Sequence, residues 1–118
     1  MQTYGSKSLF DVAEETHKSL VAWYGSQTTV AAPRLLSRYS YVVDVSYVVD
    51  VGDLFSVCVE LDKHSDEFIR FRLAAPYTER VGDCCFKHNS LLLVLQLALE
   101  DDRVDVPSPN ICRKPLSA

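Results

Sequence analysis

The sequence predicts an α+β domain with an N-terminal amphipathic helix, an antiparallel meander of three to four strands and a C-terminal buried helix. Three observations predict this order: apolar residues at helical spacing over 8–24, a hexapeptide written twice over 40–51, and a leucine-rich run within 90–102. The 118 residues fit one domain. We assign residues 1–102 to that domain and residues 103–118 to a Pro-containing extended tail.

The first predicted element is a helix over residues 8–24. Ser8 suits the capping position, and Asp11 stands three residues later as its capping-box partner. Gly25 follows directly, where a left-handed residue often ends a helix. We expect a connector over 26–37, in which Pro33 opens a short helical turn at RLLS. The apolar stripe of the helix comprises Leu9, Val12, Ala13, Thr16, Leu20 and Trp23.

The repeat SYVVDV-SYVVDV at 40–51 predicts a strand. Strand side chains alternate with period two, so a six-residue copy keeps each side chain on its face, whereas a helix would rotate it by about 240°. Fully extended, the repeat would span about 40 Å, longer than a usual strand. Gly52 and Asp53 then suit a hairpin turn. The two predicted faces are Tyr41, Val43, Val45, Tyr47, Val49 and Val51, against Ser40, Val42, Asp44, Ser46, Val48 and Asp50.

Further strands are predicted after this turn. Residues 54–61 form the return strand, 62–67 a polar loop and 68–73 a third strand that ends before Pro76. Residues 84–87 suit a short fourth strand. The meander therefore has three to four strands.

The leucine-rich run over 90–102 is compatible with a buried strand or a helix, and its length and leucine content favour the helix. Its residues are apolar nearly all round, so we expect it to be deeply buried. Glu100, Asp101 and Asp102 would oppose the dipole at a helix C-terminus, which indicates that the helix ends before them.

The second face of the repeat suggests an interface. Val42 and Val48 interrupt its polar residues, so it is not the polar outer face of a one-sided sheet. Either a helix or another chain should cover it, and an overlong strand offers unpaired backbone to a partner. We predict contacts through Val42, Asp44, Val48 and Asp50, with the two aspartates limiting uncontrolled pairing. The alternative is a coding duplication that a strand absorbed without any function.

Residues 83–88, DCCFKH, are the one stretch with potential chemistry. Cys85 and His88 have the spacing of half a metal site, which Cys58, His64 or Cys112 could complete. Cys84 or Cys85 could instead be a nucleophile with His88 as base, but that mechanism also needs an orienting acid and an oxyanion site. The chain has no phosphate-binding glycine loop, Gly-x-Ser-x-Gly elbow or dinucleotide fingerprint. We therefore expect no cofactor and no catalytic activity.

Composition narrows the class of partner. The net charge of −4 and the pI of about 5.2 argue against nucleic acid, which usually requires a basic face. The longest apolar run, 91–95, is far too short to span a membrane. The N-terminus lacks the pattern of a secretory signal, and adjacent cysteines seldom bond each other. These features predict a cytoplasmic chain, with a nuclear location also open.

By elimination, the sequence predicts a protein–protein interaction or oligomerisation module with no catalytic activity of its own. Its partners would be itself, as a homodimer or small oligomer, and an unidentified protein. The helix–meander–helix order resembles in outline small α+β interaction modules such as RWD-type domains and secretion chaperones. The alternative function is a small thiol- or zinc-dependent protein that uses Cys84, Cys85 and His88.

Overall fold

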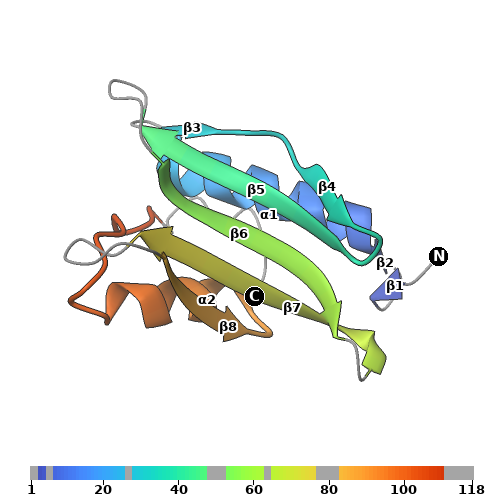
Figure 1. Ribbon diagram of the computed structural model, residues 1–118. Coiled ribbons are helices and arrows are strands. Elements are labelled where there is room, and N and C mark those ends of the chain that lie inside the picture. The colour runs from blue at the N-terminus through green and yellow to red at the C-terminus, as the bar shows by residue number, and fades with distance from the viewer. Residues whose placement is uncertain are drawn as a thin grey trace.

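The computed structural model describes residues 3–4, 7–25, 28–47, 53–62, 65–76 and 83–110. It confirms the predicted α+β fold, with an N-terminal helix, an antiparallel sheet and a C-terminal helix (Figure 1). The first helix, α1, spans Leu9–Tyr24 and has the predicted capping box. The Asp11 N–H donates to the Ser8 hydroxyl at 3.1 Å, and the Ser8 N–H donates to the Asp11 carboxylate at 3.3 Å.

The predicted left-handed cap at Gly25 is wrong. Gly25 has right-handed helical angles, φ −62° and ψ −15°, and its N–H still donates to the Val21 carbonyl at 2.7 Å. A Cβ at this position would collide with that carbonyl oxygen. Glycine is therefore needed here for close approach of the backbone rather than for a positive φ.

Six antiparallel strands form the main sheet: β3 (Thr28–Val30), β4 (Arg34–Ser37), β5 (Ser40–Tyr47), β6 (Asp53–Asp62), β7 (Ser65–Pro76) and β8 (Asp83–His88). Their order is β3-β5-β6-β7-β8, and β4 also pairs with β5, so β3 and β4 share one edge while β8 forms the other. A short hairpin of β1 (Thr3–Tyr4) and β2 (Lys7–Ser8) precedes α1.

The predicted helical turn at RLLS is also wrong, because these four residues are strand β4. Arg34 lies opposite Val42, and Leu35 lies opposite Tyr41. Pairing with β5 supplies backbone partners that the local sequence does not reveal. The third predicted strand is longer than expected, extending over Ser65–Pro76 instead of 68–73.

The two faces of the repeat separate as predicted within the described residues. Val43 and Val45 are fully buried in the core, where Tyr41 packs at the margin. Val42 and Asp44 lie on the opposite face, across from Cys58 and Ser56 of β6. The second copy of the repeat lies outside the described residues from position 48 onward.

Both helices cover the same face of the sheet (Figure 1). Helix α1 packs on β3, β5 and β6, whereas α2 (Leu91–Leu99) packs on β7 and β8. Within the described part of the chain, the other face carries no helix, and we call it the open face. The start of the predicted tail joins the core, since Val104 and Val106 are buried and the Asn110 N–H donates to the Trp23 carbonyl at 3.0 Å.

Helix α2 is buried on only one side. Leu91, Val94, Leu95 and Ala98 enter the core, as the sequence predicts. The outward side carries three further leucines, Leu93, Leu97 and Leu99, which are 43%, 40% and 37% exposed. The prediction of deep burial is therefore correct for one side of α2 and wrong for the other, because one sheet covers only one side of a helix that is apolar all round.

Candidate functional site

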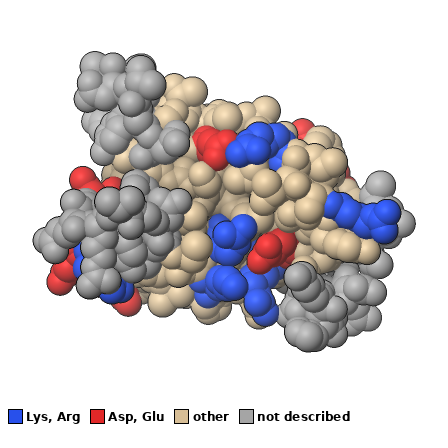
Figure 2. All heavy atoms as spheres, in the orientation of Figure 1, with Lys and Arg blue, Asp and Glu red and all other residues tan. Residues whose placement is uncertain are grey.

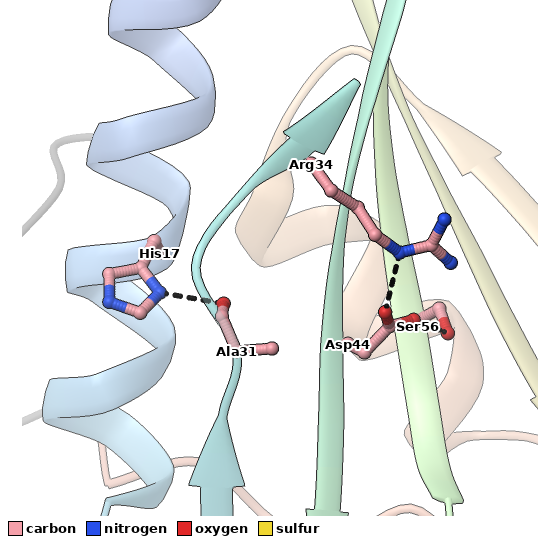
Figure 3. Close-up of polar contacts among 5 residues, drawn as sticks. All are labelled: His17, Ala31, Arg34, Asp44 and Ser56. Atoms are coloured by element: carbon pink, nitrogen blue, oxygen red, sulfur yellow. Dashed lines mark hydrogen bonds and ion pairs between the residues drawn. The ribbon is translucent and has the colours of Figure 1, made fainter. Parts of the chain in front are cut away.

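The predicted interface on the repeat is largely occupied by contacts within the chain. Val42 is only 6% exposed, and Arg34 and Cys58 lie opposite it on the neighbouring strands. The Asp44 carboxylate accepts hydrogen bonds from Arg34 Nε at 3.1 Å and from the Ser56 hydroxyl at 2.8 Å (Figure 3). Val48 and Asp50 lie outside the described residues. Val42 therefore presents little surface to a partner, whereas the Asp44 side chain is 32% exposed. This interface stays a prediction.

The connector before β4 is fixed to both layers of the fold. His17 of α1 donates from Nδ1 to the Ala31 carbonyl at 2.9 Å (Figure 3). The Ala31 N–H in turn donates to the Asp44 carbonyl of β5 at 2.9 Å. These two hydrogen bonds hold the chain at the sheet edge just before Pro33, so that β4 begins at a defined position.

A cluster of two thiols and two charged groups lies on the open face. Arg72 of β7 approaches Cys85 Sγ at 3.9 Å and Glu60 at 3.9 Å, and the Cys58 thiol lies 3.8 Å from Glu60. Burial and the Glu60 charge raise the pKa of the Cys58 thiol, against the smaller opposing effect of Arg72. A thiol with a raised pKa is a poor nucleophile at neutral pH.

The half metal motif is divided between the two faces of β8. Cys85 lies beside Arg72 on the open face, whereas His88 faces α2 and its Nδ1 accepts the Ser90 N–H at 3.2 Å. Alternation along the strand causes this separation, since positions 85 and 88 differ by an odd number. The side chain of Cys84 is not among those described. In the described ranges, no group of three or more His, Cys, Asp and Glu side chains could hold a metal ion.

An apolar surface lies where β8 meets the outward side of α2, and we call it the β8–α2 surface. It comprises Phe86, His88, Leu93, Leu97 and Glu100, which line two adjoining shallow hollows. The remaining lining is polar: Gln96, Asp101, Asp102 and Arg103. Leu93, Leu97 and Glu100 recur at helical spacing, so they form one stripe along α2. This stripe is the part of α2 that the core leaves uncovered.

Strand β8 is also an open edge of the sheet. It pairs with β7 through six consecutive residues, from Asp83 opposite Pro76 to His88 opposite Phe71, with no shift of register. In the described part of the chain no strand pairs with its other side. Such an edge presents unpaired N–H and C=O groups. Strand β8 contains neither a proline nor a bulge, and exposed Lys87 is its protective charge.

A second apolar surface lies at the opposite edge, and we call it the β4 surface. It comprises Leu35, Leu36 and Tyr39, which are 63%, 50% and 49% exposed. Phe10 of α1 contacts Tyr41 beside them, with ring centroids 5.5 Å apart. This edge is partly protected, because Pro33 precedes β4 and the register shifts between Leu35 and Ser37.

Comparison of the chain with protein-family models, with curated proteins and with solved structures gave no match. Among the helices that the structure describes, none is long and apolar enough to cross a membrane. The assignment of function therefore depends on the surfaces themselves.

Sequence reasoning missed both surfaces. The composition of α2 signalled unusual apolarity, but only the position of the helix over β7 and β8 shows which leucines remain exposed. The β4 surface was not predicted, because a helical turn was expected at the same residues.

Proposed function

We propose that this chain is a non-catalytic protein-interaction or oligomerisation module that binds protein through its sheet edges, chiefly the β8–α2 surface. The observation that carries the proposal is the exposed leucine stripe of α2 beside edge strand β8, whose outer side pairs with no strand among the described residues. Contiguous apolar patches on soluble domains typically mark binding sites. Open edge strands are a common route for adding a strand from a partner.

The edge strand and the leucine stripe of this surface would contribute different interactions with a partner. Backbone N–H and C=O groups of β8 supply hydrogen bonds whose geometry is independent of the partner's sequence. Leu93 and Leu97 supply apolar area whose burial drives association. Partners in this proposal are a further copy of the chain and an unidentified protein.

The proposal includes a reducing compartment, the cytoplasm or the nucleus. It is supported by Cys58 and Cys85, which are both free thiols. Cys58 is buried beside Glu60 and Arg72, where it packs as a small apolar side chain.

A capture experiment tests the function. Tagged chain is immobilised and exposed both to a differently tagged copy and to extract of the cells in which the chain is naturally made. When both tagged copies carry Leu93→Glu/Leu97→Glu, retention of one by the other should be lost, and less protein should be retained from extract, because the change places two carboxylates in the apolar stripe. Thermal unfolding of the variant should stay close to that of the wild type, since both leucines are substantially exposed.

The matched control is Val21→Glu on α1, because Val21 is 41% exposed and α1 packs on the far strands. This control should retain the same proteins as the wild type. The proposed function fails if the wild type retains no protein at all, or if the double variant retains everything that the wild type retains.

A further inference from the structure

We propose that the partner at the β8–α2 surface is a second copy of this chain, which docks head to tail through its β4 surface. This inference rests on the proposed function and names the occupant of the same site. The β4 and β8 edges belong to one sheet, so edge-to-edge docking continues that sheet from one copy into the next.

The positions of the two helices make these edges complementary in shape. Leu35 lies opposite Tyr41, so it points to the helix-covered side of the sheet, yet it is 63% exposed because α1 packs on β3, β5 and β6. At the other edge, α2 packs under β7 and β8 and leaves Leu93 and Leu97 uncovered. Docking β4 beside β8 of the next copy places Leu35 over this uncovered stripe.

Charge also favours unlike surfaces. Beside the stripe of α2, the carboxylates of Glu100, Asp101 and Asp102 outnumber the one cation in the same hollow, Arg103, which pairs with Asp101. Beside the leucines of β4, Arg34 and exposed Arg38 outnumber Asp44, which pairs with Arg34. Figure 2 shows acidic side chains mixed with basic ones at the end of the molecule where α2 finishes, and basic side chains at the opposite end near the turn from β4 to β5. Complementary charge of this kind selects partners and orientation.

A contact between two copies of the same surface gains nothing from this complementarity, because neither surface then meets a surface of opposite net charge. A head-to-tail contact does, and it leaves one surface of each kind unused at the ends of an assembly.

The contact should be reversible. Strand β4 has four residues, is preceded by Pro33 and contains a register shift, so it can pair with little of β8. Most of the contact then depends on the leucines. Because a head-to-tail contact is not self-complementary, repeated docking gives a ring or an open chain of copies instead of a closed dimer.

Complementation between two variants tests the arrangement. Leu93→Glu/Leu97→Glu removes one surface, and Leu35→Glu/Leu36→Glu removes the other. Each variant alone should sediment as a monomer at concentrations where the wild type exceeds twice the monomer mass. An equimolar mixture should reach twice the monomer mass and no more, because each copy then has one usable surface.

Other outcomes overturn the inference in distinguishable ways. If either variant alone dimerises, or if the mixture stays monomeric while the wild type assembles, the contact is not head to tail. If the wild-type chain is monomeric but retains another protein in the capture experiment, this inference is wrong and the proposed function still holds. If the wild-type chain retains no protein, both the inference and the proposed function are wrong. If either glutamate pair lowers the thermal stability of the chain, serine is used at the same four positions instead.

Discussion

Leu95 and Leu97 of α2 stand two residues apart, and alanine should affect them in different ways. Leu95 is 1% exposed and belongs to the core, whereas Leu97 is 40% exposed and belongs to the outward stripe. If α2 has one side for the core and one for a partner, Leu95→Ala should reduce the free energy of unfolding. Leu97→Ala should mainly weaken association.

The expected magnitudes follow from burial. Replacing a fully buried leucine by alanine costs about 2–5 kcal/mol, since a cavity remains. Leu97→Ala leaves no enclosed cavity, so its cost to the monomer should be about 1 kcal/mol or less. Full burial of a leucine is worth about 1.5–3 kcal/mol, so covering the exposed 40% contributes about 0.6–1.2 kcal/mol, or a threefold to eightfold change in Kd.

Urea unfolding of dilute protein measures the first effect, and sedimentation velocity over a dilution series measures the second. The reasoning is refuted if Leu97→Ala destabilises the dilute chain as much as Leu95→Ala. It is equally refuted if Leu97→Ala leaves the concentration dependence of the wild type unchanged.

The remaining predictions concern Tyr24, Asp101 and the thiols of Cys58 and Cys85. Tyr24→Phe should leave stability unchanged or raise it by up to about 1 kcal/mol in urea unfolding, because the buried hydroxyl has no hydrogen-bond partner among the described residues. Burial also raises the pKa of Tyr24 above its ordinary 10.0, so the unfolded chain ionises first above that pH; alkaline loss of stability should therefore be smaller in Tyr24→Phe, and an equal loss would contradict this. Side-chain and backbone hydrogen bonds from Arg103 lower the pKa of Asp101 from 3.8 to about 2. NMR titration of Arg103→Ala should therefore show this pKa raised toward 3.8, although the backbone donor remains, and an unmoved midpoint would disprove the side-chain contact. Site-resolved alkylation should modify exposed Cys85 before buried Cys58, whose pKa is raised by burial, and the reverse order would contradict the placement of these strands.

Local sequence signals predicted the parts of the fold that depend on neighbours along the chain. Ser8 and Asp11 form a capping box within one turn, so their types and spacing were sufficient. The repeat likewise predicted which valines enter the core, because alternation is a local property of strands. The end of α2 at Leu99, before three acidic residues, agrees with the dipole argument.

Properties that depend on distant segments were not predictable in this way. Strand β4 exists because β5 pairs with it, although RLLS alone is compatible with a helical turn. Val42 is buried in the folded chain, opposite Arg34 and Cys58 of two other strands, and its residue type alone did not reveal this burial. Cys85 and His88 looked like half a metal site because sequence spacing does not show that they face opposite sides of β8.

Amide hydrogen exchange along β8 at low and high protein concentration tests the central claim most directly. If β8 is a binding edge, its outward N–H groups should exchange more slowly as concentration rises. Amides of β4 should follow the same trend, whereas those of central strand β6 should not change because they are already paired on both sides. Exchange in β8 that is identical at all concentrations, in a chain whose average mass does increase, would contradict assembly through this edge.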